Sequence, residues 1–275
     1  MRLSFVLPIV CVLAGPAWAD GREDAAQAGA ATEARDFAEA SRLYTRALAD
    51  KTLEPRQQVI VLLRRAAVLK ELARYPDALA DLDLATKTDK DFGMRADNSG
   101  RKVAILILYN RGIVHEAMER YDLAIADYDE AIRRDPGFSW PKVNRGNVHR
   151  VLGNCGKADA DYAAALELYA KDSLALSNRA WLLATCPDAK SRDGARAVAL
   201  ARDAIAITDH PYFEGILAAA LAESGAFTEA VEVQERAITL LDPADTAMQG
   251  EFRKRLTAYE QKKPWRDVPK TATGK

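Results

Sequence analysis

The chain has 275 residues, of which 49% are hydrophobic, 29% are charged and only 7% are aromatic. The formal net charge is −1, and acidic and basic residues are interspersed, so the sequence has no basic field that would hold a nucleic-acid backbone. Alanine recurs at nearly every helical turn among leucine, glutamate and arginine. This composition favours helices that pack closely through small residues.

The first 19 residues differ in kind from the rest of the chain. Arg2 supplies a positive charge, residues 3–13 are almost wholly apolar, and Ala17 and Ala19 place small side chains just before a polar stretch. This order is that of a secretory signal peptide cleaved after Ala19. The alternative is a membrane anchor, but the apolar run is shorter than the roughly 20 residues that a membrane span needs. We therefore expect a periplasmic or secreted protein with no stable membrane insertion after cleavage.

Beyond this segment, one pattern of residues recurs at a shift of 34. The recurring residues are Asn110-Arg111-Gly112, Asn144-Arg145-Gly146 and Asn178-Arg179-Ala180, while Ala124, Tyr128 and Ala131 recur as Ala158, Tyr162 and Ala165. They resemble the tetratricopeptide repeat (TPR) family, whose unit is a helix–turn–helix of 34 residues. The strings Ala180-Trp181-Leu182-Leu183-Ala184-Thr185-Cys186-Pro187-Asp188 and Lys263-Pro264-Trp265-Arg266 also resemble a group of bacterial exported TPR-containing proteins.

The resemblance implies an all-α fold, an α-solenoid of about six TPR helical hairpins with a C-terminal capping helix. Extending the register along the chain places the units at about 21–54, 59–92, 105–138, 139–172, 173–210 and 211–244, with the cap at 246–262. A five-residue insertion around Pro187 delays the second helix of the fifth unit. The superhelical domain is thus expected over 20–263, and residues 264–275 are expected to form a flexible tail.

The resemblance further implies a concave groove lined by the first helix of each hairpin. Asparagine amides there can donate to and accept from an extended peptide, and tryptophan supplies anchoring area. The alternative is that the asparagines satisfy hydrogen bonds within the array and the tryptophans fill space between hairpins. The candidate groove residues are Tyr109, Asn110, Trp140, Asn144, Asn147, Arg150, Asn178 and Trp181.

Two cysteines, Cys155 and Cys186, remain after signal cleavage. Cys155 lies where the second helix of the fourth unit begins, and Cys186 lies where the first helix of the fifth unit ends. Because these adjacent helices run antiparallel, the two residues are a candidate disulfide in an oxidising compartment. The alternative is a pair of small buried side chains that never bond.

Metal binding and catalysis have little support in the sequence. His115 and His149 share a repeat position that normally holds a packing residue, so we expect core packing and no metal site. Asp127 and Glu130 are expected on a solvated helix surface near Arg133 and Arg134. The sequence contains no phosphate-binding loop, nucleophile elbow or His-Glu-x-x-His motif, and no cofactor is expected.

These features predict a non-catalytic scaffold of the cell envelope that binds a peptide segment or protein partner in the concave groove. The alternative is a permanent structural subunit of a larger envelope assembly. A cysteine-dependent enzyme is the third hypothesis, and the sequence has no Cys-x-x-Cys pair to support it. The identity of the partner and the oligomeric state do not follow from the sequence.

Overall fold

The computed structural model describes residues 22–50, 53–92 and 103–270. This part of the chain is helical apart from its turns and residues 263–270, and it contains no strand. The predicted all-α fold is therefore confirmed. The signal peptide predicted over 1–19 lies outside the described residues. The helices are α1 Arg22–Glu33, α2 Phe37–Ala49, α3 Pro55–Glu71, α4 Tyr75–Phe92, α5 Val103–Ala117, α6 Tyr121–Arg134, α7 Ser139–Val151, α8 Cys155–Leu168, α9 Ser173–Thr185, η1 (a short 3-10 helix) Ala189–Ser191, α10 Gly194–Ile207, α11 Pro211–Glu223, α12 Phe227–Leu240 and α13 Thr246–Glu260.

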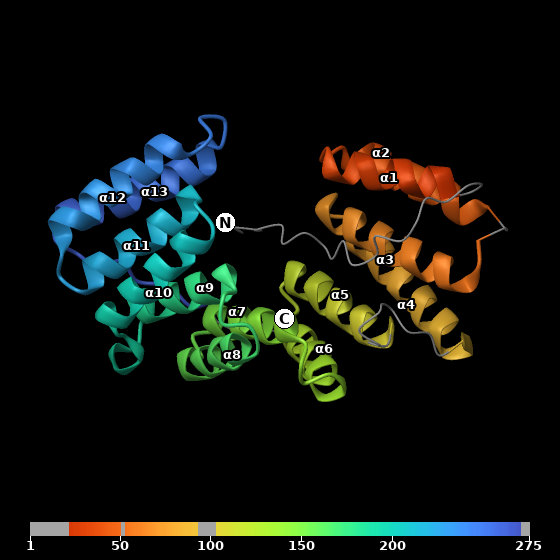
Figure 1. Cartoon of the computed structure of the whole chain (residues 1–275), viewed down its shortest axis with the longest axis horizontal. Helices are drawn as coiled ribbons and strands as arrows, with labels where there is room; N and C mark the ends of the chain where they lie inside the picture. The colour runs from red at the N-terminus through yellow and green to blue at the C-terminus, as the bar shows by residue number, and fades with distance from the viewer. Residues whose placement is uncertain (1–21, 51–52, 93–102, 271–275) are drawn as a thin grey trace. The chain divides into compact units, whose positions relative to one another are not determined.

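The chain divides into two compact units, Met1–Pro136 and Gly137–Lys275. Among the described residues, unit 1 contains the hairpins α1–α2, α3–α4 and α5–α6 (Figure 1). Unit 2 contains the hairpins α7–α8, α9–α10 and α11–α12, and α13 packs on α12. Six hairpins and a final helix are thus present, as the repeat register predicts. No helix in the described ranges is long and apolar enough to cross a membrane.

The second helix of every hairpin buries the same small residue at the same two places. Alanine is the fourth and the eleventh residue of each of these helices, and each of these alanines is fully buried. With no side chain beyond Cβ, alanine lets the backbones of neighbouring helices approach closely. The residues are Ala40 and Ala47, Ala78 and Ala85, Ala124 and Ala131, Ala158 and Ala165, Ala197 and Ala204, and Ala230 and Ala237.

Two glycines mark the closest approach of the paired helices. A Cβ atom added at Gly112 would lie 2.5 Å from Cε1 of Tyr128, and one added at Gly146 would lie 2.7 Å from Cε1 of Tyr162. Both tyrosines are fully buried. The first helix therefore needs a glycine at this point, because the tyrosine ring of the second helix occupies the space of a side chain.

A buried Arg–Asp pair joins the two helices of three hairpins. Arg65 Nη2 lies 2.6 Å from Asp81 Oδ1. The equivalent distance is 2.5 Å from Arg111 to Asp127 and 2.5 Å from Arg145 to Asp161. In each pair Nε also donates to the carboxylate, so the contact is bidentate. The partners are 16 residues apart every time. The arginine of the recurring Asn-Arg-Gly pattern thus links its helix to the next one.

Asp127 corrects the sequence-based expectation. We expected it on a solvated surface, but it is only 5% exposed and is held by Arg111. Glu130 does lie on the surface, where Arg133 and Arg134 donate to it and lower its pKa to about 2. Acidic residues on one helix therefore serve two purposes, because Asp127 faces the paired helix and Glu130 faces water.

The fifth hairpin breaks the pairing rule. Position 195, sixteen residues after Arg179, holds Ala195, and the inserted segment with η1 displaces the start of α10. Arg179 turns to the preceding hairpin, where its Nε lies 2.7 Å from Asp159 Oδ1 on α8. This ion pair joins the fourth hairpin to the fifth within unit 2.

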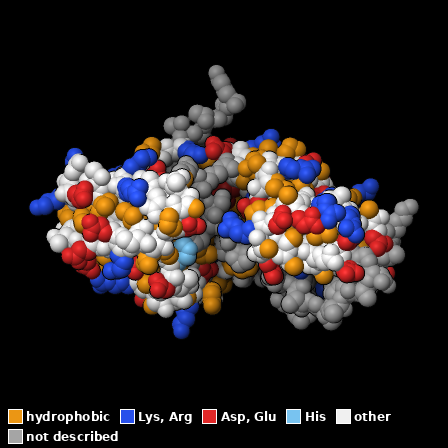
Figure 2. Space-filling model, turned by 90° about the horizontal axis from the view of Figure 1, so that it is seen from above, with side chains coloured by type: hydrophobic (Ala, Val, Ile, Leu, Met, Phe, Trp, Pro, Cys, Tyr) orange, Lys and Arg blue, Asp and Glu red, His pale blue; other side chains and the backbone are white. Residues whose placement is uncertain are grey.

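Charged side chains of both signs are mixed within each unit on the face that Figure 2 shows. This mixture agrees with the interspersed charges of the sequence. The visible face does not offer a large region of one sign that would attract a polyanion.

Candidate functional site

The last described residues contact unit 2 through a defined set of groups. We predicted a flexible tail over 264–275, but residues 264–267 are half-buried and the backbone of this segment is bonded to two helix ends. Asp267 N donates to the Thr185 carbonyl at 2.9 Å, and Lys270 N donates to the Val151 carbonyl at 2.8 Å. The carbonyls at the end of a helix lack intrahelical donors, so they are available to a passing chain. The prediction is therefore corrected for 264–270, and residues 271–275 lie outside the described part.

We call the helix residues that contact this segment the tail-binding surface. They come from the first helices α7, α9 and α11 of the three hairpins of unit 2 and from α13. The members are Arg150, Val151, Trp181, Ala184, Thr185, Glu223 and Arg255.

Asp267 occupies the centre of the tail-binding surface. Arg150 Nη1 donates to Asp267 Oδ2 at 2.6 Å, and Trp181 Nε1 donates to the same oxygen at 3.0 Å. Burial alone would lower the pKa of Arg150, but the Asp267 carboxylate and the neighbouring Tyr162 and Tyr212 raise it by more. Arg150 is therefore charged, and the pair is a charge-assisted hydrogen bond in a partly buried setting.

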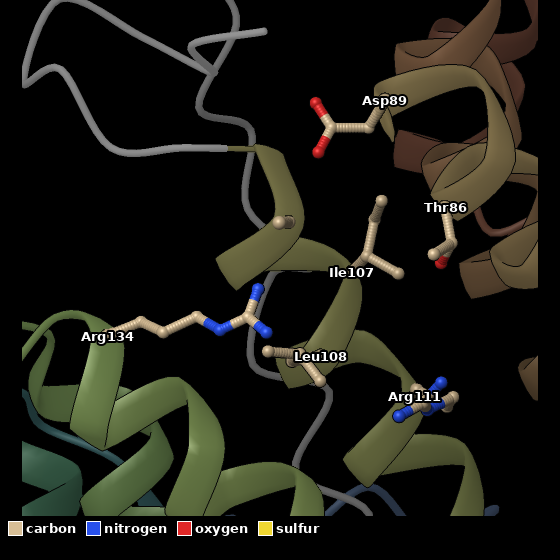
Figure 3. Close-up of a pocket in the computed structure, with 7 residues that line it drawn as sticks. Thr86, Asp89, Ile107, Leu108, Arg111 and Arg134 are labelled. Carbon is tan, nitrogen blue, oxygen red and sulfur yellow. The ribbon is translucent and has the colours of Figure 1, made fainter. Parts of the chain in front are cut away.

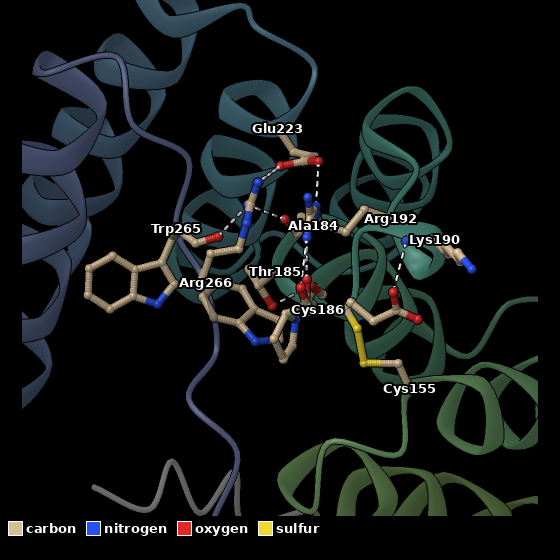
Figure 4. Close-up of polar contacts among 12 residues, drawn as sticks. Cys155, Ala184, Thr185, Cys186, Lys190, Arg192, Glu223, Trp265 and Arg266 are labelled. Atoms are coloured by element: carbon tan, nitrogen blue, oxygen red, sulfur yellow. Dashed lines mark hydrogen bonds and ion pairs between the residues drawn. A yellow bond between two sulfur atoms is a disulfide. The ribbon is translucent and has the colours of Figure 1, made fainter.

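Arg266, the residue before Asp267, carries the opposite charge and also binds unit 2. Its Nη2 lies 2.6 Å from Glu223 Oε2 at the end of α11, and its Nη1 donates to the Ala184 carbonyl at 3.2 Å. Arg192 approaches the same carboxylate from the other side, with Nε 2.9 Å from Glu223 Oε1 (Figure 4). Glu223 thus holds two guanidinium groups, one from the body of unit 2 and one from the tail.

Arg255 of α13 connects the aromatic residues of this region. Its guanidinium carbon lies 4.4 Å from the ring centre of Trp181 and 5.9 Å from that of Trp265. A guanidinium over an indole face is a favourable cation–π contact, and the weaker hydration of arginine makes burial tolerable. Trp265 therefore has a partner in the array.

Two of the predicted groove residues, Arg150 and Trp181, thus converge on one carboxylate. Asn178, one turn before Trp181, is half-buried, and no hydrogen bond within the described ranges involves its amide. On α7, Asn147 accepts a 2.7 Å hydrogen bond from the Tyr162 hydroxyl, and Asn144 is buried. Trp140 lies beside Phe138, with ring centres 5.7 Å apart.

Tyr109 and Asn110 belong to unit 1 and have local roles. Asn110 Nδ2 donates to the Leu106 carbonyl of its own helix at 2.8 Å. Tyr109 is buried, and its ring centre is 6.3 Å from that of Tyr128. The three equivalent asparagines therefore have different environments, since Asn110 satisfies its own helix while the amide of Asn178 is available.

Sequence reasoning missed Glu223 and Arg255 of the tail-binding surface, and Asp267 of the tail that it binds. Glu223 and Arg255 looked like ordinary charged helix positions, which only the fold distinguishes. Trp265 carried a signal that could have been used, since a tryptophan in a polar C-terminal stretch buries area only if the stretch docks. The Arg65, Arg111 and Arg145 pairs also had a signal, an aspartate sixteen residues later in each repeat.

Cys155 and Cys186 form a disulfide, with their Cα atoms 6.4 Å apart. Cys155 is the first residue of α8, and Cys186 follows the last residue of α9, as expected. Because Thr185 precedes Cys186, the bond fixes the end of α9 next to the carbonyl that accepts from Asp267 (Figure 4).

The two repeat-position histidines do not lie in a cluster of potential metal ligands. His115 and His149 are both buried, and no group of three or more His, Cys, Asp or Glu residues in the described ranges could hold a metal ion. His115 Nε2 lies 3.8 Å from Asp127 Oδ2. Burial lowers the pKa of His115, although Asp127 opposes this shift.

A pocket of about 370 Å³ lies in unit 1 and contains none of the predicted groove residues. Ile107 and Leu108 of α5 make an apolar wall, and Arg134 of α6 reaches over it (Figure 3). The Arg111 guanidinium at its edge is already engaged by Asp127. The lining residues are Thr86, Asp89, Ala104, Ile107, Leu108, Arg111 and Arg134. Arg134 is likewise paired with Glu130, so both arginines that line the pocket already have carboxylate partners.

Comparison with known proteins agrees with this architecture. Residues 105–138 match the family model described as tetratricopeptide repeat. No curated protein matches the chain. A tetratricopeptide repeat protein from Parabacteroides merdae has a TM-score of 0.61 at 17% identity, covering 88% of this chain and 87% of that one. A TPR protein from Thermus thermophilus has a TM-score of 0.55 at 16% identity, covering 74% and 99%.

A third solved structure, the APC/C hetero-tetramer Cut9–Hcn1, has a TM-score of 0.59 at 13% identity, covering 88% of this chain and 51% of that one. At such identities the likeness concerns the fold. The described chain has the fold of a TPR array, and the predicted resemblance to TPR proteins is confirmed.

Proposed function

We propose that this protein is a non-catalytic interaction scaffold of the cell envelope, which binds a segment of a partner protein on the first helices of unit 2. The observation that carries the proposal is the tail-binding surface itself. An irregular segment lies across three hairpins there, held by charged side chains and by carbonyls at helix ends. TPR arrays present extended surfaces suited to such a segment.

Two features support the envelope location. The N-terminal 19 residues have the order of a signal peptide, and the disulfide between Cys155 and Cys186 is of the kind that persists in oxidising compartments. Cell fractionation together with mass spectrometry of the mature N-terminus tests this part. A chain that starts at Asp20 and is recovered with periplasmic or secreted markers is expected. Recovery of the uncleaved chain in the cytoplasm would contradict it.

The absence of catalysis is part of the same proposal. Arg150, Trp181 and Glu223 of the tail-binding surface are paired with Asp267 and Arg266 of the tail, and these contacts join no nucleophile to a general base. Turnover that is lost in a Cys186→Ser variant while the fold is kept would revive the enzyme hypothesis.

Photocrosslinking in the native envelope tests partner binding. A crosslinking amino acid at Asn178 on α9 is expected to capture a defined partner. The matched control places it at Leu240 on α12, which is 54% exposed and lies outside the tail-binding surface. Equal capture at both positions would argue against the proposed face. A stoichiometric partner that resists high salt would favour the alternative, a permanent subunit of an envelope assembly.

A further inference from the structure

The segment that binds unit 2 presents three different side chains in succession. Trp265 lies near Arg255 of α13, Arg266 pairs with Glu223 of α11, and Asp267 pairs with Arg150 of α7. Each side chain therefore meets a group of complementary chemistry on a different helix. The surface is a row of three subsites, for an aromatic, a basic and an acidic residue.

The backbone contacts of the segment do not depend on its sequence. Asp267 N binds the Thr185 carbonyl, and Lys270 N binds the Val151 carbonyl. Any extended chain could donate these hydrogen bonds. They fix the register of the segment, and the three side chains then provide the selectivity.

Polar contacts hold Arg266 and Asp267 of the tail, while Trp265 packs against the hydrophobic core of unit 2. Residues 264–267 are half-buried, residues 268–270 are exposed, and Val268 is 89% exposed. Departure of the segment therefore removes the packing of the Trp265 indole, which an aromatic residue of a partner would restore. Its departure would leave the charges of Arg150 and Glu223 without these partners, and a chain with the same groups would restore them.

The tail also leaves part of the surface unused. Nε of Arg150 is buried and has no hydrogen-bond partner within the described ranges. The amide of Asn178 is available one turn from Trp181. The segment therefore does not satisfy every donor that the surface offers, which a partner with further acceptors could do.

We propose that the tail-binding surface recognises an extended segment of a partner protein with an aromatic, a basic and an acidic residue in succession, and that residues 265–267 occupy it as a built-in competitor. The inference rests on the proposed function and names the ligand class of the same site. Since only residues 261–263 separate α13 from Pro264, the tail is present at a high effective concentration, and a partner must displace it.

Two variants of the full chain distinguish a competitor from a fixed brace. Asp267→Ala and Arg150→Ala remove the same ion pair, but only Asp267→Ala leaves the helix side of the site intact. The probe is the peptide of residues 263–270, acetylated, amidated and fluorescently labelled, and binding is followed by anisotropy. Circular dichroism checks that each variant is folded.

The Asp267→Ala variant is expected to bind the peptide at least about tenfold more tightly than the unaltered chain, because the competing contact is lost. The Asp267→Ala/Arg150→Ala double variant should lose this gain. A peptide with asparagine in place of its aspartate should bind at least about tenfold more weakly. Trp265→Ala is a second way to release the tail, should Asp267→Ala fold poorly. The surface control is Arg133→Ala in unit 1, which should not alter binding.

Equal affinity of the peptide for the unaltered and Asp267→Ala chains would overturn the proposal, and so would full binding by the double variant. Concentration-dependent dimers of the unaltered chain that vanish with Asp267→Ala would overturn it in favour of tail exchange between copies. If the peptide does not bind the Asp267→Ala chain while crosslinking at Asn178 still captures a partner, the proposed ligand class is wrong and the proposed interaction function stands. If the peptide binds but no partner is captured, the function itself is in question.

Discussion

Arg150 Nη1 lies 2.6 Å from Asp267 Oδ2, although the two residues are 117 positions apart in the chain. The contact joins the first helix of unit 2 to the segment that follows its last helix. Trp181 donates to the same oxygen, so the carboxylate is shared by α7 and α9. Two residues that the sequence assigns to an open groove thus have a partner from the same chain, and binding of another protein there is a competition.

The bidentate Arg–Asp pairs give a first prediction on stability. Arg145→Ala should lower the free energy of unfolding by about 1.5–3 kcal/mol, because Asp161 is buried and would lose its charged hydrogen bonds. Urea denaturation measures the change. The control is Arg133→Ala, whose exposed pair with Glu130 should contribute little to the free energy of unfolding. Equal losses in the two variants would contradict a structural role for the buried pair.

The close approach of helices gives a second prediction. Gly146→Ala should destabilise the chain by about 1–3 kcal/mol, because the new Cβ would lie 2.7 Å from the Tyr162 ring. Gly250→Ala is the matched control within α13, where a Cβ meets no atom within 4 Å. That variant should gain up to about 1 kcal/mol from helix propensity. Thermal unfolding of both variants would test the contrast, and a stabilised Gly146→Ala protein would refute it.

The disulfide gives a third prediction. Its sequence separation is 31, and closing such a loop restricts the unfolded chain by roughly 3–4 kcal/mol. Reductant should therefore lower the denaturation midpoint of the oxidised protein. The Cys155→Ala/Cys186→Ala variant should be indifferent to reductant, which makes it the control. Two titratable thiols in the protein purified without reductant would show that the bond does not form in solution.

His115 gives a prediction on pH. Burial lowers its pKa below the usual 6.5, so the unfolded chain takes up its proton at a higher pH than the folded chain does. The unfolded state then binds more protons, and stability falls as the pH drops through about 6.5 until it passes the folded pKa.

NMR titration of the His115 ring should give a pKa below 6.5, and a lower one still in Asp127→Asn, since Asp127 raises it. The pKa of His210 is also lowered by burial, so the stability comparison uses His115→Gln to isolate the effect of His115. A measured value at or above 6.5 for His115 in the unaltered protein would refute the prediction.

Much of the fold could be predicted from the residues that repeat. Each second helix has alanine at two fixed positions, and Gly112 and Gly146 each lie opposite a tyrosine. These small residues allow the two helices of a hairpin to pack closely. The fifth hairpin was less predictable. An insertion displaces α10, so Arg179 has no aspartate sixteen residues later. It pairs with Asp159 on the neighbouring hairpin.

The candidate site could be predicted only in part. Arg150 and Trp181 were found because their repeat positions place them on first helices. Their shared ligand was missed, because no periodicity marks residues 264–267. Asp127 was misplaced for a related reason, since an aspartate on an amphipathic helix looks the same whether it faces water or a buried arginine.

The sequence by itself determined the helical array, the pairing of helices and the neighbouring positions of Cys155 and Cys186. These features depend on local contacts that recur with the period of the chain. Only the tertiary structure decided that the C-terminal segment returns to unit 2 and that Asp267 meets Arg150. Such a contact joins residues distant in sequence through single polar groups, and its geometry exists only once α7, α9, α11 and α13 are packed.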